Sequence, residues 1–187
     1  MTLSLLLLTD EWGQHHSLIP LIAQLQPLFS TVAVLDPYHG QRFAFANKAE
    51  AQHHFATRSH IGEYQQQIEA WFEQAPKHPY CALAFGAGAD ALWPLLAQRP
   101  GQVLTKAALV YGAQIPHHSE ITPLCPAQLW LCHQESEVKA RQTALNQYAD
   151  IMLTEQVAGY FNPRSEHYDP VAATQDLNIL IRYLQRT

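Results

Sequence analysis

Short runs of apolar residues recur along the chain, and small or polar residues end each of them. Uninterrupted apolar runs of this kind predict strands that are buried on both faces, as in a parallel sheet. The predicted strands are Leu3–Leu8, Thr31–Leu35, Tyr80–Phe85, Lys106–Tyr111, Ala127–Cys132 and Ile151–Thr154.

Between these strands, apolar residues recur at spacings of three and four, which predicts amphipathic helices. The predicted helices are Ser17–Phe29, Ile61–Gln74, a segment from Asp90 to Leu96, Ser136–Tyr148 and Asp169–Leu184, with a short helix near Lys48–His54 in an otherwise loop-like stretch. Alternation of strands and helices predicts one α/β domain over residues 1–187. We expect a three-layer αβα sandwich around a mostly parallel sheet of about six strands.

Composition narrows the class of protein. With 48% apolar and 14% charged residues, the chain is expected to be globular, and its net charge of −5 argues against nonspecific nucleic-acid binding. The first apolar run is too short for a membrane span, and no lysine or arginine precedes it. Cys81, Cys125 and Cys132 lack CxxC spacing, which predicts buried free thiols. We therefore expect a cytoplasmic protein with no membrane or nucleic-acid partner.

In a parallel sheet, ligands bind at the carboxyl ends of the strands. Among those ends, the segment Tyr80–Trp93 has a distinctive form, YCALAFGAGADALW. A buried strand, a tight turn of small residues and a helix follow one another directly, which is the geometry of a nucleophile elbow. The middle of that turn normally carries serine or cysteine. Here it is Gly86, which has no side chain with which to attack a substrate.

Six segments in register resemble the dienelactone hydrolase family of the α/β-hydrolase fold, over most of the chain. They are LLLTDEWG, TVAVLDPYHG, LAFGAGADAL, ALVYGA, PAQLWLCHQESEV and AGYFNPRSEHYDPVAA. The resemblance implies an α/β-hydrolase-like fold and a scaffold for hydrolysis by a nucleophile, a histidine and an aspartate. It places these three roles on Gly86, Ala158 and Ser136, so all three positions are substituted.

The leading hypothesis is a family-like protein that has lost its triad and binds a small carboxylate or carbonyl ligand. Without a nucleophile, the elbow is expected to relax, because glycine visits positive φ freely. The Ala87 amide and an amide near Glu11–Trp12 are expected to form an anion site. The proposed ligand-binding residues are Glu11, Trp12, Gly86, Ala87, Tyr111 and Tyr160.

Two alternatives stay open. The chain could be an active hydrolase of small esters or lactones with rearranged groups, using His133 with Glu135 or Glu137 and a nearby Cys132 or Ser136. It could also be a purely structural partner subunit, and a homodimer is a further expectation. The pairs His15-His16, His53-His54 and His117-His118 lack the spacing of a metal motif, so no metal and no cofactor are expected.

Overall fold

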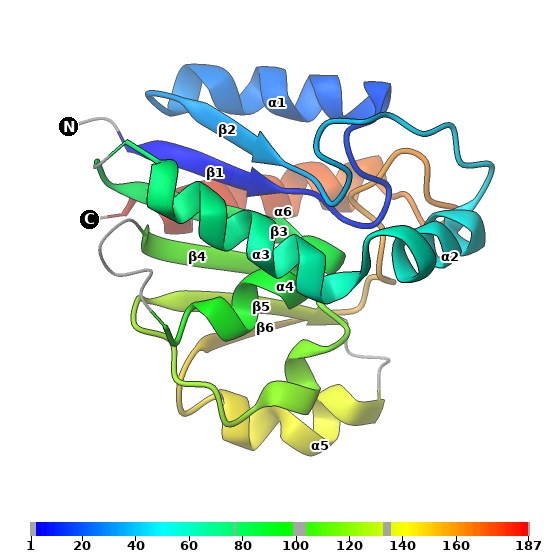
Figure 1. The fold of residues 1–187 in the computed structure, drawn as a ribbon. Coiled ribbons are helices and arrows are strands. Elements are labelled where there is room, and N and C mark those ends of the chain that lie inside the picture. The colour runs from blue at the N-terminus through cyan, green and yellow to red at the C-terminus, as the bar shows by residue number, and fades with distance from the viewer. Residues whose placement is uncertain (1–2, 77, 99–103, 133–135, 187) are drawn as a thin grey trace.

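The computed structural model describes residues 3–76, 78–98, 104–132 and 136–186, with residues 136–140 described as backbone only. Six parallel strands form one sheet in the order β2-β1-β3-β4-β5-β6 (Figure 1). They are β1 (Ser4–Leu8), β2 (Val32–Leu35), β3 (Tyr80–Phe85), β4 (Leu104–Val110), β5 (Ala127–Cys132) and β6 (Asp150–Thr154). The predicted sheet is confirmed, because every apolar run singled out in the sequence is a strand.

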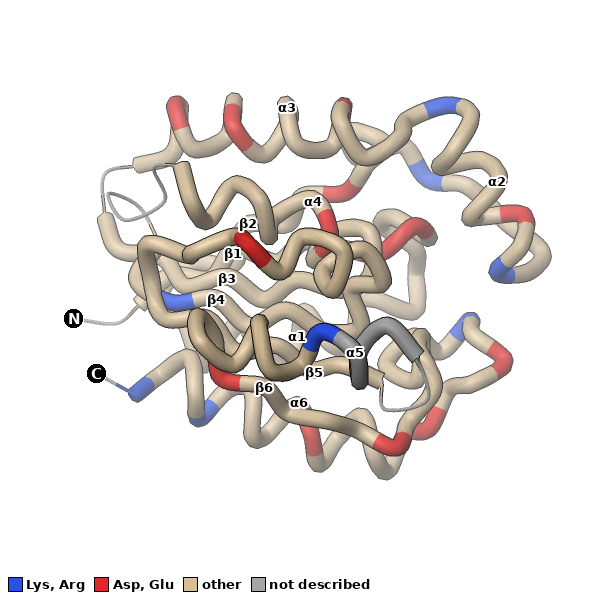
Figure 2. Tube along the Cα trace, turned by 90° about the horizontal axis from the view of Figure 1, so that it is seen from below, with Lys and Arg blue, Asp and Glu red and all other residues tan. Residues whose placement is uncertain are grey.

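Helices cover both faces of the sheet, which makes the three layers seen edge-on in Figure 2. The helices are α1 (Ile19–Leu25), α2 (Lys48–Arg58), α3 (His60–Gln74), α4 (Ala87–Leu95), α5 (Ser136–Leu145) and α6 (Pro170–Gln185). The predicted helix Ser17–Phe29 is divided, since the 3-10 turns η1 (His16–Leu18) and η2 (Gln26–Leu28) flank α1. Pro27 lies in η2 and has no amide proton for an α-helical bond.

Alternate residues of the central strands contribute to two separate cores. Leu6 and Leu8 of β1 point toward α3, α4 and α5, whereas Leu5 and Leu7 point toward α1 and α6. All four are fully buried, as expected for a strand that is covered on both faces. The three cysteines are buried free thiols, as predicted. Among the described residues, no helix is both long and apolar enough to cross a lipid bilayer.

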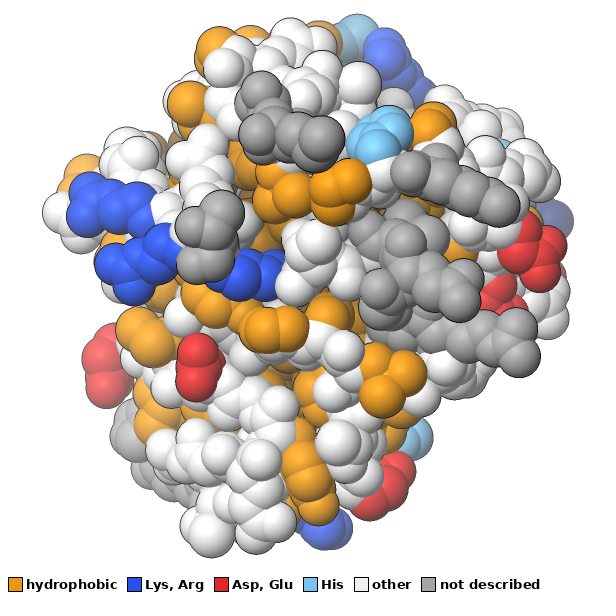
Figure 3. Space-filling model, turned by 90° about the vertical axis from the view of Figure 1, so that its left-hand side faces the viewer, with side chains coloured by type: hydrophobic (Ala, Val, Ile, Leu, Met, Phe, Trp, Pro, Cys, Tyr) orange, Lys and Arg blue, Asp and Glu red, His pale blue; other side chains and the backbone are white. Residues whose placement is uncertain are grey.

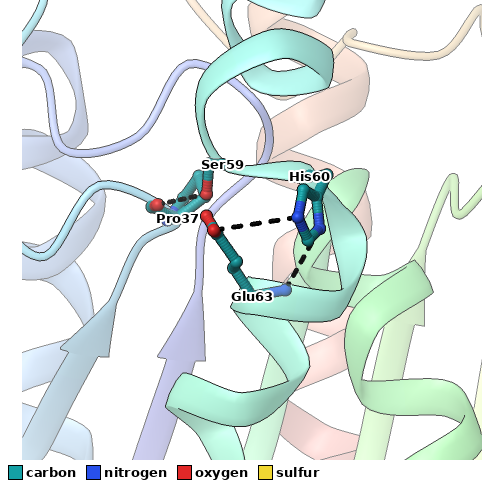
Figure 4. Close-up of polar contacts among 4 residues, drawn as sticks. All are labelled: Pro37, Ser59, His60 and Glu63. Carbon is teal, nitrogen blue, oxygen red and sulfur yellow. Dashed lines mark hydrogen bonds and ion pairs between the residues drawn. The ribbon is translucent and has the colours of Figure 1, made fainter.

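The stretch expected to be mostly loop contains an 11-residue helix, α2. The Asn47 side chain caps it by accepting from the Glu50 amide at 2.9 Å. The chain then turns sharply into α3 at His60, whose φ is +40°. Ser59 Oγ holds this corner by donating to the Pro37 carbonyl at 2.5 Å, and His60 lies 3.7 Å from Glu63 (Figure 4).

The end of the molecule where the strands begin carries both basic and acidic side chains (Figure 3). Basic side chains there gather near the carboxyl end of α6, where Lys106 Nζ donates to the Tyr183 carbonyl at 3.4 Å. The same ammonium group lies 5.4 Å from the centre of the Tyr183 ring. The cavities and buried acids described below lie at the opposite end, where the strands finish.

Candidate functional site

The bend between β3 and α4 has the backbone of a nucleophile elbow. Gly86 adopts φ +47° and ψ −117°, its amide donates to the Val110 carbonyl at 3.0 Å, and its carbonyl accepts from the Asp90 amide at 3.0 Å. The turn keeps a positive φ, and glycine holds this conformation at little cost, so the strain that a side-chain-bearing residue would carry here is absent. This agrees with the expectation of a relaxed elbow.

Close packing of α4 on β1 fixes the position of the elbow. A Cβ atom placed on Gly88 would lie 2.6 Å from the Thr9 carbonyl oxygen and 2.8 Å from Leu8 Cβ. No side chain fits at that distance, so the first turn of α4 rests directly on the end of β1. This contact brings the loop after β1 beside Gly86.

Acidic side chains occupy the space in front of Gly86. A Cβ atom placed on Gly86 would lie 3.0 Å from Asp10 Cβ, 3.1 Å from Glu11 Oε2 and 3.4 Å from Tyr111 Cε2. A crevice of about 280 Å³ opens here. Its lining includes Glu11, Trp12, Gly86, Ala87, Tyr111 and Ala158 of the predicted positions, together with Asp10, Lys48, Asp90 and Gln114. Five of the six proposed ligand-binding residues thus line one crevice.

Tyr160 does not belong with the other predicted residues. Its side chain is fully buried in the core beneath α6, and its hydroxyl donates to Asp176 Oδ2 at 2.7 Å. Its ring packs against that of Tyr111, with centroids 6.1 Å apart. The prediction that Tyr160 binds a ligand in the crevice is replaced by a packing role, because the loop after β6 turns the ring inward.

Of the amides near Glu11–Trp12 that were predicted to bind an anion, the Trp12 amide is already occupied. The Trp12 amide donates to Asp10 Oδ1 at 3.1 Å, so a neighbouring side chain already satisfies it. An aspartate at a strand end readily bonds an amide two residues on. The Ala87 amide begins α4 and is the member of the pair that remains.

Two carboxyl groups at the crevice titrate far above their usual range. Burial, followed by the charge of Glu11, raises the pKa of Asp10 to about 7, although Asn162 Nδ2 donates to its Oδ2 at 3.0 Å. Burial also raises the pKa of Asp90 to about 7, against the stabilising bond from the Gln114 amide at 2.8 Å. The sequence analysis did not single out either residue. The only signal was position, since one follows β1 and the other lies in the first turns of α4.

Ala158, to which the family resemblance assigns the histidine role, contacts a lysine through its backbone. Lys48 Nζ, from α2, lies 3.4 Å from the Ala158 carbonyl oxygen. Arg164 reinforces the same closure by donating to the Phe45 carbonyl, and its guanidinium lies 5.1 Å from the centre of the Trp12 ring. These contacts tie the loop after β6 to the segment between β2 and α2.

Within the described part of the chain, the residues suggested for a rearranged hydrolase do not come together as a catalytic group. His133 and Glu135 lie outside the described residues, and Ser136 and Glu137 begin α5 as backbone only. Cys132 is a buried core residue at the end of β5. The described residues that line the crevice include no histidine and no cysteine. Within the described ranges, no three His, Cys, Asp or Glu side chains are placed to hold a metal ion.

A second cavity, of about 150 Å³, lies between α1 and α6. Asp10 and Tyr111 line both spaces and so separate this cavity from the crevice at Gly86. On its wall, Ser17 Oγ lies 2.5 Å from His15 Nδ1. The sequence analysis treated His15 only as half of a histidine pair and did not anticipate its contact with Ser17.

Comparison with protein-family models and with curated protein sequences found no match. Among solved structures, a Klebsiella pneumoniae protein provisionally described as a dienelactone hydrolase superposes with a TM-score of 0.74 at 10% identity, over 100% of this chain and 88% of that one. A dienelactone hydrolase-like promiscuous phosphotriesterase from metagenomic libraries superposes with a TM-score of 0.69 at 14% identity. The match covers 97% of this chain and 85% of that one. A dienelactone hydrolase from Anabaena variabilis superposes with a TM-score of 0.61 at 15% identity, and the match covers 97% of this chain and 85% of that one. The chain therefore has an α/β-hydrolase-like fold.

Proposed function

We propose that the crevice above Gly86 binds a small carbonyl compound, such as a lactone or ester, without hydrolysing it. The observation that carries this proposal is the elbow itself. Its backbone geometry is intact, yet the residue at its centre has no side chain. A scaffold that keeps the bend and the crevice but not the attacking atom is suited to holding a ligand rather than cleaving it.

The walls of the crevice favour a neutral carbonyl ligand over the small carboxylate that the sequence also suggested. Asp10, Glu11 and Asp90 line it, and Lys48 is the basic residue among its described lining. Since the pKa values of Asp10 and Asp90 lie near 7, both groups are partly protonated at neutral pH and can donate to a carbonyl oxygen. A bound carboxylate would instead meet the negative charge of Glu11.

The rival proposal is an active hydrolase with rearranged groups. Hydrolysis by a covalent route needs a nucleophile within hydrogen-bond reach of a base. Ser165 is the serine among the described crevice residues, and its Oγ accepts from the His167 amide at 3.1 Å. Among the described residues, no hydrogen bond joins the Ser165 hydroxyl to a side-chain base, so the binding role is better supported.

The experiment compares an unsaturated γ-lactone with its ring-opened carboxylate, by ligand-observed NMR and by following ring opening over hours. We expect saturable binding of the lactone, weaker binding of the carboxylate, and no ring opening above the buffer rate. Glu11→Gln should strengthen carboxylate binding by about 5- to 10-fold, because it removes the nearest negative charge. Glu73→Gln, the same change on the outer face of α3, is the matched control and should alter neither affinity. Catalysed ring opening would overturn the proposal, as would equal binding of both compounds.

A further inference from the structure

We propose that Ser17 is a second, nucleophilic site that accepts acyl groups from small esters, with His15 as its base. The site lies in the cavity between α1 and α6, apart from the crevice at Gly86. It rests on the 2.5 Å contact between Ser17 Oγ and His15 Nδ1, and on the placement of both side chains in the wall of one cavity. A nucleophile hydrogen-bonded to a base is the arrangement that activates a serine hydroxyl.

The fold holds His15 firmly in place. The residue follows the loop after β1 and is 8% exposed, although it stands just before a short 3-10 turn on the surface. Its ring packs edge-on against Trp12, with centroids 6.5 Å apart. Because Trp12 belongs to the small aromatic cluster with Tyr38 and Phe45, the base is anchored by packing rather than by a flexible loop.

The environment keeps His15 unprotonated at neutral pH. Burial lowers its pKa to about 4, and electrostatic interactions with Arg164 and with the neighbouring His16 act in the same direction. With its proton on Nε2, the neutral ring presents the lone pair of Nδ1 to the Ser17 hydroxyl. The lone pair of Nδ1 is therefore free to accept the hydroxyl proton at pH 7, and the low pKa makes His15 a weak base that holds this proton only briefly.

The cavity determines the class of substrate. Its apolar wall includes Leu21, Phe85, Phe161 and Leu177, while Thr9, Asn162 and Tyr111 bring polar groups to it. A volume of about 150 Å³ accommodates a single small ring, on the scale of cavities that take up benzene. The site thus fits a short-chain ester of a phenol or of a similar small, acidic alcohol.

The chemical step is an ordinary acyl transfer. Ser17 Oγ attacks the carbonyl carbon, and its proton passes to His15 Nδ1. The bond between the carbonyl carbon and the leaving oxygen then breaks, and the leaving group takes that proton from His15. The product is an acyl ester of Ser17 and a free phenol, with His15 neutral again. In a second transfer, water attacks the acyl carbon and gives a proton to His15 Nδ1. The bond from that carbon to Ser17 Oγ then breaks, and Ser17 takes the proton back, which releases the acid.

The test treats the purified full-length protein with p-nitrophenyl acetate and maps acetylated peptides by mass spectrometry. We expect release of about one equivalent of nitrophenol and an acetyl group on Ser17 that hydroxylamine removes, since it is an oxygen ester. Absence of an acetyl group on Ser17 in the unmodified protein would overturn the proposal, whatever other residues are labelled. This readout does not depend on how any variant folds.

Three variants assign the roles. Ser17→Ala should abolish the hydroxylamine-sensitive label. His15→Gln should slow labelling by about 10- to 100-fold, at the low end for a general base, because the low pKa of His15 makes it a weak base. Ser30→Ala, an exposed serine just before β2, is the matched control and should label at the normal rate. Equal labelling of His15→Gln and the unmodified protein would show that Ser17 reacts without the proposed base. None of these results depends on lactone binding at Gly86, and Glu73→Gln on the outer face of α3 should leave labelling of Ser17 unchanged.

Discussion

At the scale of single residues, Gly86 has the backbone conformation of a nucleophile elbow without a side chain that could attack a substrate. The bend requires φ +47°, which glycine tolerates and a side-chain-bearing residue reaches only under strain. Asp10 and Glu11 now occupy the space where a nucleophile would project. Restoring a serine would therefore place it in strain and in a crowded, acidic surrounding, rather than beside a histidine.

We predict that Gly86→Ser destabilises the protein by about 2–4 kcal/mol, through backbone strain plus crowding against Asp10 Cβ at 3.0 Å, and creates no esterase activity at the elbow. Urea unfolding and an ester-hydrolysis assay in a Ser17→Ala background measure the two effects. Gly40→Ser is the matched control, since Gly40 has φ +81° but nothing within 4 Å of the added Cβ. Gly40→Ser should lower the free energy of unfolding only by the cost of backbone strain. Equal decreases in the two variants would therefore rule out crowding at Gly86.

At the scale of elements, the seating of α4 on β1 decides the shape of the crevice. Gly88 makes that contact possible, because any Cβ atom there would meet the backbone of Thr9. Backbone cannot move aside as the end of a long side chain can. The elbow, the loop after β1 and the crevice thus depend on one small residue in the first turn of a helix.

Two glycine-to-alanine substitutions in helices should change the free energy of unfolding in opposite directions. Gly88→Ala should destabilise by more than about 3 kcal/mol, since its Cβ would lie 2.6 Å from the Thr9 oxygen. Gly62→Ala in α3 should stabilise by about 0.5–1 kcal/mol, because the nearest atom to its Cβ is His60 Nδ1 at 3.5 Å and alanine favours helix. Thermal and urea unfolding of both variants provide the comparison. A stable Gly88→Ala protein would contradict the close approach of α4 and β1.

At the scale of the whole molecule, buried ionisable groups link stability to pH in opposing ways. Asp10 and Asp90 have raised pKa values, so the stability associated with their protonated forms is present below about pH 4 and is lost as the pH rises through 7. His15 has a lowered pKa, so its contribution is present above about pH 6.5 and is lost as the pH falls through 4. Because two aspartates oppose one histidine, the free energy of unfolding should fall as the pH rises from 5 to 8.

We predict that Asp10→Asn removes much of this dependence. Relative to the unmodified protein, its unfolding free energy should rise by roughly 3–4 kcal/mol between pH 4 and pH 8, at about 1.4 kcal/mol for each unit of altered pKa. Asp10→Asn leaves one carboxamide oxygen in place of two carboxylate oxygens, so either the Trp12 amide or Asn162 Nδ2 loses its acceptor. This loss should lower the free energy of unfolding by an amount that does not vary with pH. Urea unfolding across this range measures both. Asp150→Asn, on the exposed start of β6, is the control. A difference between Asp10→Asn and the unmodified protein that stays constant with pH would contradict the raised pKa.

The sequence by itself determined the order of strands and helices, the elbow and the end of the sheet where the crevice lies. These follow from hydrophobic periodicity and from small residues in turns, which act over a few neighbouring positions. The sequence also indicated the empty centre of the elbow, because Gly86 needs no structure to be recognised. It predicted Tyr160 in the crevice only by its place at a strand end, and the fold turns that ring into the core.

Only the tertiary structure decided the chemistry around Gly86. Asp10 acquires its raised pKa from burial by distant segments, and its partner Asn162 is 152 positions away in the chain. The contact of Ser17 with His15 is local, but the cavity beside it exists only because α1 and α6 cover the same face of the sheet. Burial and charge depend on which segments converge in space, whereas hydrophobic periodicity reports only whether a segment has a face to bury.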